Sequence, residues 1–134
     1  MAVSGITSSV DIAVSGMRAQ SKRLDVISGN IANAGTTRTD SGEPYRRQVA
    51  VLTAGKGIAG VAVETIDPDM DSDFQRVHQP GHPDADGDGW VQMPNVSLPN
   101  EMMNMVVASR AYQANAAVLR RYKEAVDTAL EMLR

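Results

Sequence analysis

The sequence predicts a mainly α-helical protein whose N- and C-terminal helices flank a small, irregular middle segment that contains β-structure. Two observations lead to this prediction. Apolar residues recur every seven positions at both ends of the 134-residue chain but not in its middle, and this spacing is typical of helices that form coiled coils. The middle is instead rich in glycine, proline and aspartate, which favour turns. We therefore expect three parts, residues 1–35, 36–96 and 97–134, with the two helices forming a coiled coil on assembly.

The N-terminal helix is predicted by its apolar period but is weak by composition. Its heptad positions hold Val3, Val10, Met17, Leu24 and Ile31, with Ile27 at a companion position. Three internal glycines each cost about 1 kcal/mol relative to alanine, and several serines add smaller penalties. We expect this helix to need a partner and to end near residues 33–35, where Gly35 can adopt the left-handed conformation of a helix end.

The middle segment is predicted to hold short strands. Residues 47–52 and 60–66 have strand-like composition and are separated by a glycine-rich turn, so they are expected to form a hairpin. Residues 90–93 are a further strand candidate, and prolines make the rest irregular. Because this segment is short of large side chains, we expect the ring of Trp90 to be its main apolar anchor.

The C-terminal helix is predicted to begin near Ser97. Pro99 and Glu101 suit a first turn, where a missing N–H is harmless and a negative charge meets the helix N-terminus. No further glycine or proline follows, so the helix can reach about 50 Å. Its heptad positions hold Met105, Tyr112, Leu119, Val126 and Leu133.

Polar residues interrupt the apolar positions of both helices, at Gln20 and at Asn115. In coiled coils a polar residue at such a position often fixes the register and the number of partners. The alternative is plain exposure to solvent.

Residues 55–60 read G-x-G-x-x-G, the sequence of a dinucleotide-binding turn. A dinucleotide site needs a helix to begin there, so that its N-terminus meets the pyrophosphate, whereas residues 61–66 are strand-like. A glycine-rich hairpin turn is therefore favoured, and no cofactor is expected.

Residues 84–89 match the first six positions of a calcium-binding loop. The twelfth position holds Asn95 instead of a bidentate glutamate, and upstream prolines prevent an entering helix. His78 and His82 have the spacing of metal ligands on a helix, but Pro80 lies between them. We favour a turn stabilised by aspartate side chains over a weak calcium site, and expect no metal.

Composition argues against several function classes. The net charge of −3 gives no basic surface for nucleic acid or an anionic membrane. The absence of cysteine excludes disulfides and thiolate sites. No run approaches the roughly 20 apolar residues of a membrane span, so no membrane insertion is expected, and the N-terminus lacks the pattern of a cleaved signal peptide. No residue pattern typical of a catalytic site is present, and we expect no enzyme.

Two longer motifs resemble those of a known family. Residues 28–37 (SGNIANAGTT) resemble the N-terminal signature of bacterial flagellar rod and hook proteins, whose pattern ends Asn-hydrophobic-Ala-Asn-x-x-Thr. Residues 101–115 (EMMNMVVASRAYQAN) resemble the matching C-terminal signature. Residues 80–86, 89–91 and 93–96 are similar to the stretch that distinguishes the C-type proximal-rod group.

The resemblance implies a non-enzymatic subunit of the flagellar basal-body rod, the drive shaft between motor and hook. It also implies export by the flagellar type III apparatus into the periplasm, and terminal helices that form an inner coiled-coil domain on polymerisation. The implied partners are other rod proteins, copies of this chain and the export apparatus. The expected assembly residues are Val10, Met17, Leu24, Ile27, Asn30, Ile31 and Asn33 in the first helix and Met105, Tyr112, Asn115, Leu119, Val126 and Leu133 in the last.

Two other functions stay open at this point. One is an autonomous coiled-coil adaptor or chaperone-like binding protein whose middle segment recognises a partner. The other is a small calcium-binding module built on residues 84–89. A rod subunit should be largely monomeric on its own, whereas an autonomous coiled-coil binder should be a stable oligomer.

Overall fold

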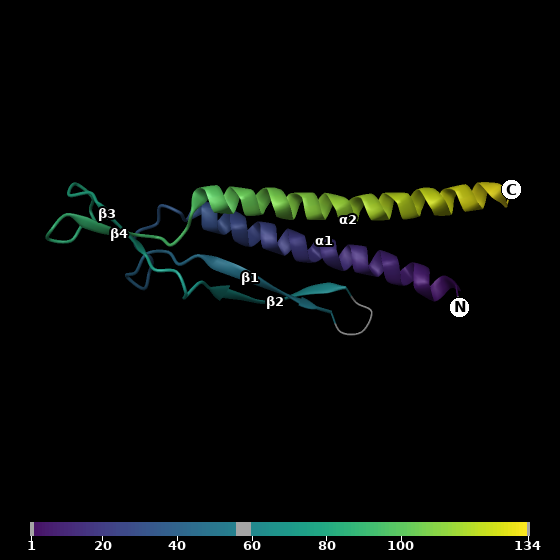
Figure 1. Ribbon diagram of the computed structural model, residues 1–134, viewed down its shortest axis with the longest axis horizontal. Coiled ribbons are helices and arrows are strands. Elements are labelled where there is room, and N and C mark those ends of the chain that lie inside the picture. The colour runs from purple at the N-terminus through teal and green to yellow at the C-terminus, as the bar shows by residue number, and fades with distance from the viewer. Residues whose placement is uncertain (1, 56–59, 134) are drawn as a thin grey trace.

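The computed structural model describes residues 2–55 and 60–133, with side chains from Ser9 onward. The protein is elongated: two long antiparallel helices lie side by side, a β-hairpin runs along one of them, and a second small sheet lies at the end opposite both termini (Figure 1). The elements are α1 (Ala2–Ala32), β1 (Gln48–Ala54), β2 (Val61–Pro68), β3 (Gln75–His78), β4 (Trp90–Met93) and α2 (Leu98–Met132). Two terminal helices around a β-containing middle are confirmed, and the coiled coil on assembly stays a prediction.

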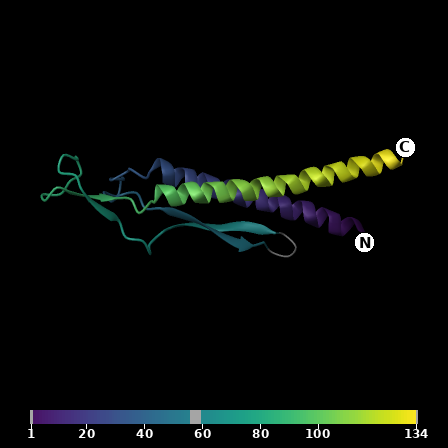
Figure 2. The same ribbon diagram turned by 45° about the horizontal axis from the view of Figure 1, so that its top comes forward.

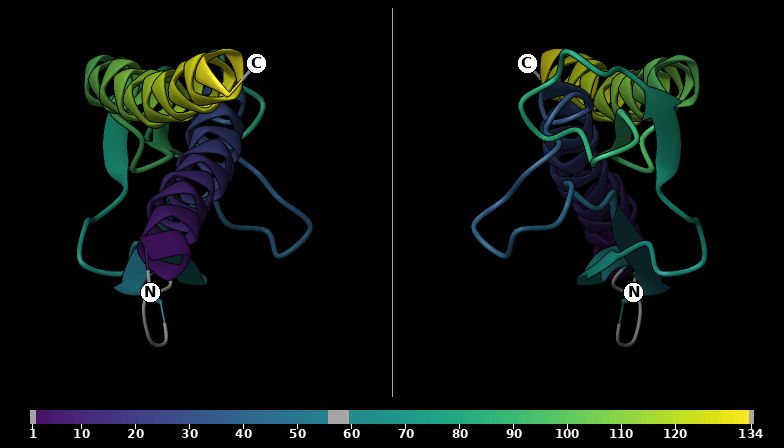
Figure 3. Two further views of the ribbon diagram at one scale, coloured as in Figure 1. Left: turned by 90° about the vertical axis from the view of Figure 1, so that its right-hand side faces the viewer. Right: turned by 90° about the vertical axis from the view of Figure 1, so that its left-hand side faces the viewer.

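α1 lies between α2 on one side and the β1–β2 hairpin on the other (Figures 1 and 3). Small side chains are buried in both helices: Ala13 and Ala19 in α1 and Ala108 in α2. Gly16 lies directly against the side chain of Asn115, since a Cβ added at Gly16 would be 2.7 Å from its Nδ2. The partner that this weak helix needs is therefore supplied by its own chain.

α1 ends through an asparagine side chain rather than through a left-handed glycine. Asn33 Nδ2 donates to the carbonyl of Gly29 at 2.9 Å, and the Thr36 hydroxyl donates to Asn33 Oδ1 at 3.2 Å. Gly35 does not have a positive φ, so the role expected for Gly35 is wrong. The helix nevertheless ends next to the predicted residues. The Asn33 side chain adds a second bond to the Gly29 carbonyl, which already accepts the Asn33 N–H at 3.1 Å, and the Ala34 N–H donates to the Ile31 carbonyl at 3.3 Å.

β1 and β2 form the predicted antiparallel hairpin, with one irregularity in register between Val51 and Leu52. At its tip, the Gly55 N–H donates to the Gly60 carbonyl at 2.8 Å. The inner residues of the G-x-G-x-x-G sequence, 56–59, lie outside the described residues. After Gly60 the chain continues directly as a strand, which confirms the hairpin and leaves no helix start for a dinucleotide phosphate.

The tip of this hairpin is attached to α1 at Ser15. The Ser15 hydroxyl accepts a hydrogen bond from the Val61 N–H at 3.1 Å and donates to the Ile12 carbonyl at 2.7 Å. Gly60 has φ +68°, and a Cβ there would lie 3.1 Å from Ile12 Cα. Glycine is thus required both by the backbone conformation and by the close approach to α1.

The second sheet pairs β3 with β4, with Val77 opposite Val91 and His78 opposite Trp90. β4 agrees with the predicted strand at 90–93. β3 was not predicted, because four residues with a single β-branched side chain between charged or polar neighbours carry too weak a pattern.

Large apolar side chains are exposed along α2. α1 covers only one side of α2, and the two helices diverge toward the termini (Figure 2). All described residues of α2 from 121 onward are exposed. The exposed apolar residues of α2 include Met102, Met103, Val106, Val107, Val118, Tyr122, Val126, Leu130 and Met132.

The contact between Gly16 and Asn115 can be tested with a matched pair of substitutions in α1. Nothing lies within 4 Å of a Cβ at Gly29, so Gly29→Ala should raise the free energy of unfolding by up to about 1 kcal/mol through helix propensity. Gly16→Ala should be less stable than Gly29→Ala, because its new methyl group meets the Asn115 amide. Adding Asn115→Ala should remove that difference in urea unfolding. Equal stabilities of the two alanine variants would contradict the close contact.

Candidate functional site

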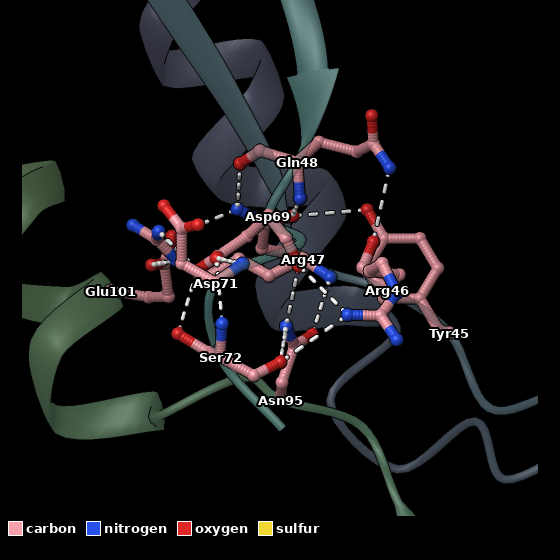
Figure 4. A network of polar contacts seen from close by, with 10 residues as sticks. Tyr45, Arg46, Arg47, Gln48, Asp69, Asp71, Ser72, Asn95 and Glu101 are labelled. Carbon is pink, nitrogen blue, oxygen red and sulfur yellow. Dashed lines mark hydrogen bonds and ion pairs between the residues drawn. The ribbon is translucent and has the colours of Figure 1, made fainter. Parts of the chain in front are cut away.

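The polar side chains of Arg47, Asp69, Asn95 and Glu101 meet where α2 joins the hairpin (Figure 4), and Asn30 of α1 bonds to Glu101. We call this cluster the polar junction: Asn30 in the last turn of α1, Arg47 just before β1, Asp69 just after β2, Asn95 between β4 and α2, and Glu101 in the first turn of α2. Asn30 and Glu101 are each only 1 % exposed. The chain has only one Trp and one Phe. At this end of the molecule, polar side chains fill much of the interior.

Asn30 uses its whole side-chain amide. Its Nδ2 donates to the Gln48 carbonyl at 2.8 Å and to Glu101 Oε2 at 3.1 Å, while its Oδ1 accepts from the Gln48 N–H at 2.8 Å and from the Tyr45 hydroxyl at 3.0 Å. Burial and the charge of Glu101 raise the pKa of Tyr45, so its hydroxyl stays a donor. The Asn30 amide thus pairs with both the N–H and the carbonyl of Gln48, as a neighbouring strand would. These two bonds fix the start of β1 against the end of α1.

Glu101 forms an ion pair with Arg47, with 2.7 Å between Oε1 and Nε. The same guanidinium reaches Asp69, with 3.4 Å between Nη1 and Oδ2. Partial burial acts to lower the pKa of Arg47, but the hydrogen bonds and charges of Glu101 and Asp69 outweigh it and raise this pKa. The position of Glu101 in the first turn of α2 also favours its negative charge. One ion pair therefore joins α2 to the base of the hairpin.

Asn95 and Asp69 hold the segment between the two sheets. Asn95 Nδ2 donates to the carbonyls of Asp69 and Ser72, each at 3.1 Å, and its Oδ1 accepts from the Arg47 N–H at 2.7 Å. Desolvation acts to raise the pKa of Asp69, but hydrogen bonds from the side chain and backbone of Ser72, with help from Arg47, lower it. The resulting stabilisation is full above the unfolded pKa of about 3.9 and is lost as the pH falls through the lowered value.

The polar junction can position the elements that meet there, because its donors and acceptors bond to one another. Within residues 2–55 and 60–133, no group of three or more histidine, aspartate or glutamate side chains is placed to hold a metal ion. Neither helix, over its described residues, has a stretch apolar enough to cross a membrane.

Two residues expected at an assembly interface lie inside the chain instead. Ile27 is buried, and Asn30 is part of the polar junction. They are core residues of the single chain rather than surface open to another subunit. Asn33, a third expected interface residue, is half-buried and completes the end of α1.

The other expected assembly residues keep part of their surface open. Along α2 their exposure ranges from half-buried, as at Met105, to 84 % at Leu133. Half-buried members are Val10, Met17, Leu24, Ile31, Met105, Asn115 and Leu119, and exposed members are Tyr112, Val126 and Leu133.

Trp90 is not the main buried anchor of the middle segment. It is 41 % exposed, whereas its neighbour Val91 is fully buried. Successive side chains of a strand point to opposite faces, and Val91 takes the inner one. The Trp90 ring packs edge-to-face with His78, with 5.1 Å between ring centroids, and Arg76 lies 5.7 Å from its centre. Trp90 thus belongs to a surface cluster on the β3–β4 sheet.

The aspartate-rich loop is held by Asp86. Its Oδ1 accepts from the N–H groups of Asp88 at 3.0 Å and Trp90 at 2.8 Å, and its Oδ2 pairs with Arg76 at 2.9 Å. The backbone hydrogen bond from Trp90, the largest cause, lowers the pKa of Asp86. Asp84 accepts from the Thr37 hydroxyl at 2.7 Å. The Asp86 carboxylate therefore stabilises the turn, as the interpretation favoured from the sequence expects, whereas Asp84 joins the loop to Thr37.

Sequence reasoning missed the polar junction as a unit. Asn30 and Glu101 were singled out in separate motifs, one at each end of the chain, with nothing to indicate that they touch. Asn95 was noted only as a poor calcium ligand, and Arg47 as the first residue of a strand. The sequence does show charged and amide side chains next to apolar runs. Which of these side chains contact one another can be seen only in the folded structure.

Comparisons with known proteins agree with one another. Residues 11–38 match the family described as "Flagella basal body rod protein", and residues 88–132 match "Flagellar basal body rod FlgEFG protein C-terminal". The flagellar basal-body rod protein FlgC of Borreliella burgdorferi is 39% identical, over 96% of this chain and 98% of its own length. FlgC of Salmonella typhimurium is 42% identical (84% and 87% covered), and FlgC of Bacillus subtilis is 38% identical (92% and 95% covered). Asn30 lies in the first matched region and Glu101 in the second.

Removing the charge of Glu101 should weaken the polar junction. Glu101→Gln keeps an acceptor for Asn30 but leaves the mostly buried guanidinium of Arg47 without its closest carboxylate, so the free energy of unfolding should fall by about 1–3 kcal/mol. The exposed pair of Arg121 and Glu124, 3.8 Å apart, provides the control: Glu124→Gln should change stability by less than about 0.5 kcal/mol. Urea unfolding at neutral pH measures both. Equal effects would show that the buried pair has no special role.

The Asp86 turn predicts a contrast between two substitutions. Asp86→Asn keeps Oδ1 as an acceptor, so the amide of Trp90 should exchange with solvent at nearly the original rate. Asp86→Ala removes that acceptor and should speed this exchange. Asp88→Ala serves as the control, because the Asp88 side chain is exposed. Hydrogen exchange monitored at Trp90 by NMR distinguishes these outcomes, and unchanged exchange in Asp86→Ala would refute the role of the side chain.

Proposed function

The chain belongs to the family of flagellar basal-body rod proteins of the FlgC type, and from this premise we propose that it assembles into the rod through the exposed apolar surface of its terminal helices. As a family member it is a structural subunit of the rod, located in the flagellar basal body among its other components, and not an enzyme.

One observation carries the proposal. α2 exposes large apolar side chains on several sides, and all of its described residues from 121 onward are exposed. Contiguous exposed apolar surface on a water-soluble subunit marks a place where another chain binds. The apolar residues of α2 also follow the heptad spacing of helices that pack on other helices.

The finer assignment follows from the same premise. The terminal helices form the inner coiled-coil domain of the proximal rod, so the subunit helps to make the drive shaft between motor and hook. Its neighbours are copies of itself and other rod proteins. It reaches the periplasm through the flagellar type III export apparatus.

The alternative of an autonomous adaptor or chaperone-like binder is the weaker explanation. Relatives described as rod proteins match this chain over nearly its full length, including the middle segment that an adaptor would use to recognise a partner. The calcium-module alternative is also weaker, because the Asp86 carboxylate already accepts hydrogen bonds from its own loop and Asp84 already accepts one from Thr37.

Substitutions in the heptad of α2 test the proposal. Leu119→Ala combined with Val126→Ala should stall rod growth. Replacing a leucine buried between helices of neighbouring subunits by alanine costs about 2–5 kcal/mol, and this loss recurs in each subunit. The isolated chain should lose little stability, since Leu119 is half-buried and Val126 exposed there. Basal bodies counted by electron microscopy, together with motility, give the readout.

Arg120→Ala, on the same helix, is the matched control and should leave assembly intact. Export of the double variant should continue, which separates an assembly defect from a failure to leave the cell. Normal basal bodies in the double variant would contradict the proposed assembly surface.

A further inference from the structure

A groove of about 850 Å³ runs between α1 and β2. Its apolar lining comes from β2, with Val61, Val63 and Ile66, and its basic lining comes from α1, with Arg18 and Lys22. Arg18 and Lys22 are exposed and one helical turn apart, so both can reach a ligand lying along the groove. One carboxylate, Glu64, also lines it. The groove therefore suits an elongated partner with both apolar and acidic side chains.

The end of α2, residues 124–133, has that character. Within it, Val126, Leu130 and Leu133 are exposed apolar residues on one helix face. The segment carries three carboxylates, those of Glu124, Asp127 and Glu131, and no lysine or arginine. We call this segment the α2 tail.

We propose that the α2 tail of one copy occupies the α1–β2 groove of a second copy. Asp127 and Glu131 are one helical turn apart, the same spacing as Arg18 and Lys22, so two ion pairs can form side by side. The apolar residues of the tail then face those of β2. The lengths also agree, since the tail spans about 15 Å and the groove side of β2 about 17 Å.

The tail of a chain cannot fill the groove of the same chain. α1 lies between α2 and the hairpin, and α2 makes no contact with β1 or β2 in the described residues (Figures 1 and 3). A contact between tail and groove joins two different surfaces, so it is heterologous and can continue from copy to copy. This inference rests on the proposed function, because it takes the uncovered end of α2 to be an assembly surface.

Cysteine cross-linking tests the contact in the full-length protein, which has no cysteine of its own. One preparation carries Val63→Cys and the other Leu130→Cys, so a mixed disulfide between them must join two copies. Met103→Cys replaces Leu130→Cys in the control, because Met103 is similarly exposed (64 % against 60 %) at the other end of α2. We expect the mixed product with Leu130→Cys and not with Met103→Cys, both in concentrated protein and in rods isolated from cells that express both variants.

Charge reversal provides a second measurement that does not depend on the apolar contact. Arg18→Glu with Lys22→Glu should lower the yield of the mixed disulfide by about fivefold or more, and Asp127→Lys with Glu131→Lys should do the same. Combining the groove reversal in one copy with the tail reversal in the other should restore the yield. Circular dichroism of each variant checks that the chain is folded.

The outcomes separate this inference from the proposed function. Rods that assemble without the mixed disulfide would overturn the tail-in-groove contact and leave the rod assignment standing. A disulfide from the Leu130→Cys chain to a different rod protein would overturn the second copy as the occupant. A yield that is insensitive to charge reversal, or not restored by the combination, would also overturn the proposed pairing.

Discussion

The buried ion pair between Arg47 and Glu101, with Asn30 bonded to the same carboxylate, is the interaction on which the rest of the structure depends. It is the point where α1, α2 and the hairpin meet. Burying charged and amide groups is costly unless each is matched, so this arrangement tolerates one geometry and penalises others strongly. Its main effect is therefore to specify the direction and register of the elements. In particular, it brings residues 30 and 101 together and makes the two terminal helices run antiparallel.

The slender architecture follows from how little apolar surface the chain can bury. The buried apolar side chains of the two helices include Ala13, Ala19 and Ala108, and Gly16 lies directly against Asn115. Such small residues let helices approach closely but remove little area from water. α1 compensates by packing on two sides, against α2 and against the hairpin. α2 packs on one side only, and all of its described residues past residue 120 are exposed. The polar side chains at the polar junction are thus bonded within the chain, whereas apolar side chains of α2 toward the C-terminus are exposed.

The sequence predicted what depends on local pattern and failed where distant residues combine. Heptad spacing located both helices, and the glycine-rich turn between apolar runs located the first hairpin. β3 was not predicted because its four residues show no clear alternation of apolar and polar side chains. Trp90 was expected inside on account of its size, but strand alternation gives the inner face to Val91. The polar junction could not be predicted, since Asn30 and Glu101 lie 71 positions apart and only the fold makes them partners.

In this chain, polar interactions fix the shape of the subunit, and exposed apolar side chains are left for contacts with other subunits. The donors and acceptors of the polar junction are bonded within a single chain, to one another and to nearby backbone groups, so a second subunit has little hydrogen bonding to gain there. Each subunit can therefore have a fixed shape before it meets a neighbour. The open surface of α2 is mostly apolar and non-directional, and it can gain affinity by burial without disturbing the junction. On the proposed assembly, the polar junction determines the shape of the subunit and the helix surfaces hold the subunits together.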